Sequence, residues 1–257
     1  MNPYQECIES FFLRIIELRH TAYHINGLLN NSINSIENYQ SDFISGSALV
    51  ISDWTGPSDN GWEINYHTGF RKIYLKETYS NEISRVISQE CCFAFSQAFE
   101  ALEKFFKDCA YIRIQTIKNQ NDTRIPLNIL NLSREEMLSG DKLFELIKKC
   151  IGNEFNIASG KNNKNLRFKE FWTVLSECRH AIVHSNSYIK LKKVSKTDYH
   201  LGVFEYFFDH KIELNEKVMI ELNYRKLDEL FKKMSEYAFQ IFKLLSLKES
   251  IDWNILK

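Results

Sequence analysis

The stretch FWTVLSECRHAIVH, residues 171–184, carries the pattern that decides the fold of this chain. On a helix at about 100° per residue, its apolar side chains gather in a single arc. Together with Phe168, which precedes the stretch, that arc consists of Phe171, Trp172, Leu175, Ile182 and Val183. The opposite side carries Thr173, Glu177, His180 and His184. The spacing therefore predicts an amphipathic helix over about residues 166–186.

Arg179 breaks this pattern because it lies near the centre of the apolar arc. A guanidinium keeps its charge, so it needs a carboxylate, a phosphate or an opening to solvent. His180 and His184 are four residues apart and are therefore neighbours on the helix surface. Two interpretations follow. Either Arg179 is a buried ion-pair member of a helical scaffold, or these three residues form a functional site.

The rest of the chain predicts a mainly α fold. Its 257 residues include only three Pro and nine Gly, and this scarcity of helix breakers favours long helices. Apolar residues at helical spacing predict further helices at 4–30 (extending to about 39), 81–118, 134–151 and 223–247. Asn223 is a suitable N-cap for the last of these. We expect a single helical domain, residues 1–257, with an insertion at about 41–80.

Two regions depart from the helical pattern. The insertion is rich in turn residues, and we expect it to be partly irregular, with a short strand around Arg71–Leu75. Trp54 and Trp62 are candidates for anchoring it to the body of the protein. Near the C-terminus, VFEYFF (203–208) and KVMIEL (217–222) have β-like composition and predict a small hairpin. The polar run NIASGKNNKN (156–165) predicts a break before the motif helix.

The composition, 44% hydrophobic and 26% charged, is typical of a globular protein. The six cysteines include no C-x-x-C pair, which argues against a zinc site or a disulfide scaffold. Neither a signal peptide nor an apolar run of about 20 residues is evident. We therefore expect a cytoplasmic protein with reduced thiols and no membrane association.

Charge is distributed unevenly, although the net formal charge is zero. Residues 141–200 contain twelve Lys and Arg against six Asp and Glu, a surplus of six positive charges on both sides of the motif helix. Such a segment attracts phosphates. The candidate substrate-binding residues are Lys164, Arg167, Lys190, Lys192 and Lys193. The alternative is an ordinary solvated, lysine-rich surface.

The hexapeptide RHAIVH, residues 179–184, resembles the R-x-x-x-x-H signature of HEPN domains, in which a polar residue, here His180, follows the arginine. The apolar run that leads into it is also similar to that family. The resemblance covers residues 168–188 in sequence and about 80–250 in architecture. It implies a helical bundle that dimerises and brings two motifs into one cleft. It further implies a metal-independent endoribonuclease, often a prokaryotic toxin or antiviral defence effector, or else a non-catalytic module that binds RNA, a nucleotide or a partner protein.

Metal-free RNA cleavage suits these residue types, because the 2′-OH can attack the adjacent phosphate and leave a 2′,3′-cyclic phosphate. Histidine can transfer protons near neutral pH, so we expect His184 to act as general acid/base. Arg179 would bind the phosphate and stabilise charge in the transition state. We expect His180 to position the substrate or assist His184, and Glu177 to orient the His180 ring.

The expected assembly is a homodimer, because Arg179 and His184 lie about 140° apart on one straight helix and a composite cleft would bring them together. RNA is the expected partner, and an antitoxin or sensor protein is a further candidate. We expect no cofactor. Glu17, His20 and His24 share one face of the first helix at metal-capable spacing, but zinc needs further ligands that the sequence does not identify. The alternative there is an exposed polar face, and we expect no metal.

Overall fold

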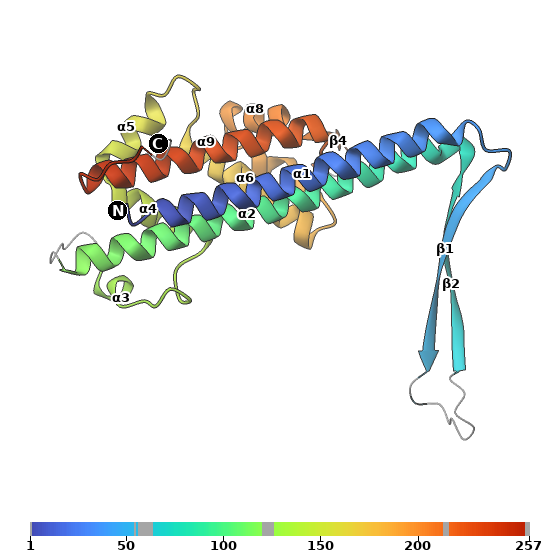
Figure 1. Ribbon diagram of the computed structural model, residues 1–257, viewed down its shortest axis with the longest axis horizontal. Coiled ribbons are helices and arrows are strands. Elements are labelled where there is room, and N and C mark those ends of the chain that lie inside the picture. The colour runs from blue at the N-terminus through green and yellow to red at the C-terminus, as the bar shows by residue number, and fades with distance from the viewer. Residues whose placement is uncertain (1, 54, 56–63, 120–125, 213–215, 255–257) are drawn as a thin grey trace. The chain divides into compact units, whose positions relative to one another are not determined.

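A computed structural model describes residues 2–53, 55, 64–119, 126–212 and 216–254 (Figure 1). The fold is mainly α, as the sequence predicts. The chain divides into two compact units, one formed by residues 1–24 with 88–257 and the other by residues 25–87. The second unit contains the insertion expected at about 41–80 together with the helical segments that flank it.

The helices are α1 (Gln5–Ile36), α2 (Tyr79–Asn119), α3 (Leu127–Leu130), α4 (Gly140–Ile151), α5 (Asn153–Gly160), α6 (Phe168–His184), α7 (Leu191–Val194), α8 (Asp198–Phe207) and α9 (Tyr224–Lys248). The strands are β1 (Phe43–Asp53), β2 (Ile64–Leu75), β3 (Tyr188–Lys190), β4 (Asp209–Ile212) and β5 (Lys217–Glu221). A 3-10 turn, Lys76–Thr78, leads into α2.

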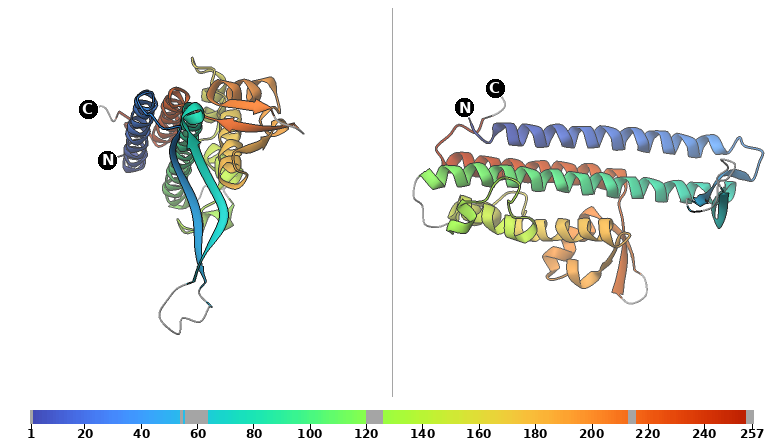
Figure 2. Two further views of the ribbon diagram at one scale, coloured as in Figure 1. Left: turned by 90° about the vertical axis from the view of Figure 1, so that its right-hand side faces the viewer. Right: turned by 90° about the horizontal axis from the view of Figure 1, so that it is seen from below.

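In the first unit, the parts of α1 and α2 that belong to it lie side by side with α9 (Figure 2). The apolar stripe of α1 is buried there, at Ile8, Phe11, Ile15, Leu18 and Ala22. The long helix α9 begins where the sequence predicts, because the side chain of Asn223 accepts a hydrogen bond from the backbone N–H of Lys226 at 3.0 Å.

Trp172 occupies the centre of the core of this unit. It is fully buried, and its ring stacks on Phe106 of α2 with centroids 5.0 Å apart. The ring centroids of Phe99 in α2 and Phe144 in α4 lie 5.1 and 5.9 Å from that of Trp172. Tyr237 of α9 adds an edge-on contact with Phe106 at 5.5 Å. These contacts bury most of the predicted apolar face of α6 against α2, α4 and α9. Val183, which the sequence pattern also placed on that face, is exposed on the last turn of the helix.

A three-stranded antiparallel sheet of order β3-β5-β4 follows the motif helix in the same unit. It contains the predicted C-terminal hairpin, in which His210 pairs with Ile220. The assignment of residues 203–208 as a strand was wrong, because they belong to α8, and β4 begins only at Asp209. Thr197 caps α8, and its buried positions His200, Val203, Phe204 and Phe207 recur at helical spacing, so tertiary packing overrides the local β propensity.

Two other boundaries differ from expectation. The helix predicted to begin at 134 begins at Gly140, after an irregular segment, and α5 occupies the first half of the predicted polar break, residues 156–165. The first is a difference of extent, whereas α5 is a helix that the sequence pattern did not predict.

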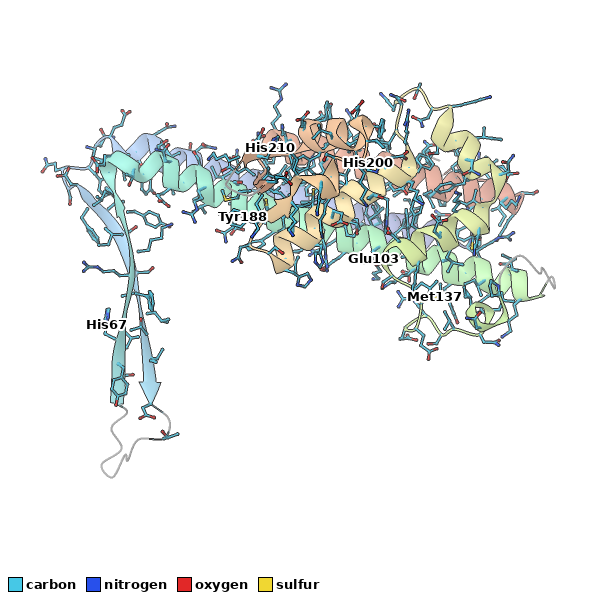
Figure 3. All side chains as sticks on the ribbon, turned by 180° about the vertical axis from the view of Figure 1, so that it is seen from behind. His67, Glu103, Met137, Tyr188, His200 and His210 are labelled. Atoms are coloured by element: carbon cyan, nitrogen blue, oxygen red, sulfur yellow. The ribbon has the colours of Figure 1, made fainter. Side chains whose placement is uncertain are left out.

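The second unit consists of an antiparallel hairpin and the helical segments beside it. Strands β1 and β2 pair from Phe43↔Leu75 to Asp53↔Ile64, with two irregularities in register. The expected short strand at Arg71–Leu75 is thus the end of a twelve-residue strand, on which Figure 3 labels His67. Trp54 and Trp62, the candidate anchors, lie outside the described residues. At the base of the hairpin, the Lys76 ammonium donates hydrogen bonds to the backbone carbonyls of Glu37 and Tyr39.

We expect Trp172→Ala to lower the free energy of unfolding by about 3–5 kcal/mol, because it removes the largest side chain of the core. Tyr237→Phe should leave that free energy unchanged or raise it, since the buried Tyr237 hydroxyl has no hydrogen-bond partner among the described residues. Urea denaturation of both variants measures this. A loss of more than about 1.5 kcal/mol in Tyr237→Phe would show that the hydroxyl is bonded after all.

We further expect stability to fall on acidification partly through His200, which lies in α8 (Figure 3). Burial lowers the pKa of His200 below its usual value near 6.5, so the unfolded chain takes up this proton more readily than the folded one. Below pH 6.5, protonation of the unfolded state therefore costs folding free energy. The loss of stability between pH 7.5 and 5.5, measured by urea denaturation, should be smaller in His200→Asn than in the wild type.

Candidate functional site

The end of α6 is held in place by the small sheet. After His184, the backbone N–H groups of Ser185 and Ser187 both donate to the carbonyl of Ala181, at 2.9 and 3.1 Å. Asn186 and Ser187 have positive φ angles of 49° and 66°, a left-handed conformation that closes the helix sharply. The Ser187 carbonyl then accepts a hydrogen bond from Ile220 of β5 at 2.8 Å. The last turn of the motif helix is thus fixed by hydrogen bonds to its own carbonyl at Ala181 and, through Ser187, by a hydrogen bond to β5.

Arg179 lies at the edge of the core, facing α2. Its Nη2 donates to Oε1 of Glu100 at 2.7 Å, and the Arg179 side chain retains 26% of its exposure against 56% for Glu100. The Nε atom is buried, and no partner for it exists among the described residues. The guanidinium is therefore neither sealed in the core nor fully paired, and it retains hydrogen-bonding capacity for an anion that reaches it.

His180 and His184 are both exposed on the last turns of α6. Their ring centroids are 4.9 Å apart with the planes inclined by 51°, so the two imidazoles form one small polar surface. Among the described residues, no hydrogen bond or ring contact joins either imidazole to Arg179. The structure thus brings the two histidines together, and it directs the arginine to a different neighbour.

Glu177, expected to orient the ring of His180, has a different partner. Its Oε2 accepts from Nζ of Lys193 at 3.0 Å, across from α6 to α7. This ion pair positions Lys193 beside the motif helix. An orienting role of Glu177 toward His180 stays a prediction.

The candidate substrate-binding residues fall into two groups. Lys190, Lys192 and Lys193 follow the C-terminal end of α6, where Lys190 and Lys192 are exposed. Lys164 and Arg167 precede the N-terminal end, and the Arg167 guanidinium stacks over the Tyr199 ring at 4.7 Å. The helix between them has seventeen residues, which corresponds to about 25 Å. Only the first group lies near the histidines in the chain.

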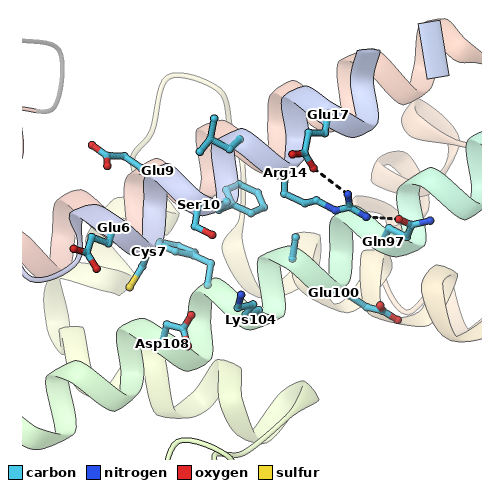
Figure 4. Close-up of a pocket in the computed structure, with 14 residues that line it drawn as sticks. Glu6, Cys7, Glu9, Ser10, Arg14, Glu17, Gln97, Glu100, Lys104 and Asp108 are labelled. Atoms are coloured by element: carbon cyan, nitrogen blue, oxygen red, sulfur yellow. Dashed lines mark hydrogen bonds and ion pairs between the residues drawn. The ribbon is translucent and has the colours of Figure 1, made fainter. Parts of the chain in front are cut away.

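Glu100 is the residue at this site that sequence analysis did not identify. It belongs to α2 and also lines an open groove of about 840 Å³ between α1 and α2 (Figure 4). The charged side chains of the groove are mostly acidic, namely Glu6, Glu9, Glu17, Glu100 and Asp108, against Arg14 and Lys104. Glu100 and Arg179 are 79 residues apart, so no local pattern could have paired them. The sequence indicated only that Arg179 needs a carboxylate, a phosphate or an opening to solvent.

The candidate metal residues of α1 have other contacts. Nε2 of His20 and Nε2 of His24 share a hydrogen bond at 2.9 Å, and Glu17 pairs with Arg14 at 3.0 Å. Within the described part of the chain, no group of three or more His, Cys, Asp and Glu side chains is arranged to hold a metal ion. Nor does that part contain a helix with the length and apolar character needed to cross a membrane.

Comparisons with known proteins found no family model that matches the chain, and no similar curated protein or solved structure. The HEPN family therefore stays a prediction that rests on residues 179–184 and on the helical run that leads into them.

We expect Glu100→Gln to change the free energy of unfolding by about 1 kcal/mol or less, because the ion pair with Arg179 is partly exposed and screened by solvent. Thermal and urea denaturation at low and high salt measure the effect. A loss well above about 2 kcal/mol would indicate that Glu100 compensates an otherwise buried charge, which is the behaviour of a purely structural ion pair.

Proposed function

We propose that the protein is a metal-independent endoribonuclease of the HEPN type, which acts in the cytoplasm as a homodimer and serves as a prokaryotic toxin or antiviral effector. One observation carries the proposal. An incompletely paired guanidinium, Arg179, lies on the same helix end as two exposed and adjacent imidazoles, His180 and His184. These are the groups that metal-free cleavage of a phosphodiester requires. The biological role rests on the family resemblance alone.

In the proposed reaction, the ribose 2′-OH attacks the adjacent phosphorus and the bond from phosphorus to the 5′ oxygen breaks. A base removes the proton of the 2′-OH, and an acid protonates the departing 5′ oxygen. His184 supplies one of these two proton transfers, because its imidazole is exposed and imidazole is the side chain most often used for general acid–base catalysis. The products are a 2′,3′-cyclic phosphate and a 5′-OH, and no metal or cofactor takes part.

Arg179 serves the phosphate itself. Negative charge grows on the non-bridging oxygens during attack, and a guanidinium can donate two parallel hydrogen bonds to them. The phosphate would have to compete with Glu100 for Nη2, and a half-exposed carboxylate is an easily displaced partner. The exposed part of the Arg179 side chain would give the phosphate access to Nη2.

We infer a homodimer from the directions of these side chains. Arg179 is turned toward α2 and Glu100, whereas His180 and His184 are exposed on another side of α6. One chain therefore does not present the guanidinium and the His184 imidazole to the same phosphate. Two copies related by a two-fold axis can bring Arg179 of one protomer near His184 of its partner, and each dimer then has two equivalent sites.

Lys190 and Lys192 would hold the RNA backbone beside the histidines through charge, without reading the base sequence. Lys164 and Arg167 lie about 25 Å away at the other end of α6, so they would contact only a longer strand.

The direct test is cleavage of 5′-labelled single-stranded RNA in excess EDTA by the wild type, His184→Ala and Arg179→Ala. We expect cleavage by the wild type, products with cyclic-phosphate ends, and a loss of about 100-fold or more in each variant. His20→Ala and Arg19→Ala are matched controls, because they remove an exposed histidine of a similar pair and an exposed ion-paired arginine on α1. Both controls should cleave like the wild type.

Equal cleavage by all five proteins would contradict the proposal, since the activity would then not depend on the motif. Absence of cleavage with RNA retention that requires Arg179 would also overturn it, in favour of a non-catalytic RNA-binding module.

A further inference from the structure

The hairpin of the second unit leaves its apolar side chains in solvent. Strands β1 and β2 form a two-stranded sheet, and none of the side chains that the structure describes in them is buried (Figure 1). A lone two-stranded hairpin is marginally stable in water, and a further strand or a packed face stabilises it. Large apolar side chains that are 39–77% exposed occur on both strands: Phe43, Leu49, Val50, Ile51, Tyr66, Phe70, Ile73 and Leu75.

The exposed apolar surface of the hairpin is large enough for a stable protein contact. Side chains of this kind have about 150–200 Å² each, so eight of them at roughly half exposure give on the order of 700 Å². A standard protein interface takes about 800 Å² from each partner. The hairpin therefore offers about the surface that one subunit contributes to a stable dimer.

The two edges of the hairpin differ in charge. Strand β1 runs from Phe43 to Ser52 without a charged residue or a proline, so it lacks the features that block strand pairing at an edge. Strand β2 contains Arg71 and Lys72. Basic side chains on an edge strand oppose pairing with a second copy, because that copy brings the same charges. The outer edge of β1 is therefore the favourable one for a further strand.

We propose that the hairpins of two copies of this chain pair along β1, antiparallel and about a two-fold axis, into a four-stranded sheet of order β2-β1-β1-β2. A second copy fits this edge because two uncharged β1 strands meet without repulsion, while the basic β2 strands take the outer positions. A two-fold contact uses the same surface on both partners. The inference does not rest on the proposed ribonuclease activity.

Val50 and Ile51 lie at the seam of this sheet. They are adjacent in β1, so their side chains point to opposite faces. Their cross-strand partners in β2 are His67 and Tyr66. In the four-stranded sheet, both apolar side chains gain neighbours from β1 of the second copy, whereas His67 and Tyr66 stay one strand away from the seam. The four positions therefore provide a matched pair of variants.

The test is sedimentation equilibrium of the full chain over a range of concentrations, without RNA. The wild type should associate reversibly. Val50→Lys/Ile51→Lys should raise the dissociation constant about tenfold or more, because lysines then meet across the seam on both faces and apolar contacts are lost. Tyr66→Lys/His67→Lys places the same two lysines at the paired positions of β2, and this control should associate like the wild type.

Hydrogen exchange of the wild type gives a second readout that needs no substitution. In the associated state, β1 of the second copy protects the outer backbone amides of β1, residues 43–53. Dilution below the dissociation constant should therefore accelerate exchange in this strand more than in β2, residues 64–75.

Four results would overturn the inference. A wild type that is monomeric at every concentration would show that no second copy covers the hairpin. Equal association of the wild type and both variants would place the contact elsewhere in the chain, and this outcome leaves the proposed catalytic dimer intact. Equal weakening by both variants would show that β1 is not the seam. Exchange in β1 that does not change on dilution would show the same, even if a substituted chain fails to fold.

Discussion

The position of α6 depends on the stacking of Trp172 against Phe106. This contact, with Phe99 and Phe144 around it, presses the apolar face of α6 against α2 and α4, and Tyr237 extends the same cluster to α9. Because a helix is stiff, fixing it at Trp172 also fixes the side chains two turns later. Arg179 must then face α2, and the histidines must face outward. The candidate site is thus a consequence of how the core packs.

Arg179 occupies an intermediate environment. Its Nε is buried without a partner in the described part of the chain, while Nη2 reaches the half-exposed carboxylate of Glu100. An unsatisfied buried donor costs about 1–3 kcal/mol, but it does not by itself mark a functional arginine, because Nε of Arg113, whose ion pair with Glu249 is buried, also lacks a partner among the described residues. A surface arginine would not bury Nε at all. The exposure of its ion pair is what distinguishes Arg179 from Arg113, and the exchange of Glu100 for a phosphate is the role that we propose for it.

Sequence periodicity predicted the elements that are amphipathic on their own. Most of the buried face of α6 and the Asn223 cap of α9 follow from local spacing, and the structure confirms them, except that Val183 of the predicted apolar arc is 46% exposed. The assignment of the aromatic run at 203–208 to a strand was wrong. The β propensity of these residues is real, but Phe204 and Phe207 are buried on one face of a helix. The extent of β2 was missed because the alternation around its glycine is weak. The Arg179–Glu100 pair joins two helices distant in sequence, and no single-sequence pattern encodes such a contact.

The central proposal is a composite catalytic site that takes Arg179 from one chain and His184 from the other. The most direct measurement mixes inactive Arg179→Ala and His184→Ala proteins, allows the subunits to exchange, and assays RNA cleavage in EDTA. Random exchange makes half of the dimers mixed, and each mixed dimer has one intact site out of two, so the mixture should recover about a quarter of wild-type activity. A mixture that remains inactive while the wild type cleaves would contradict the composite site.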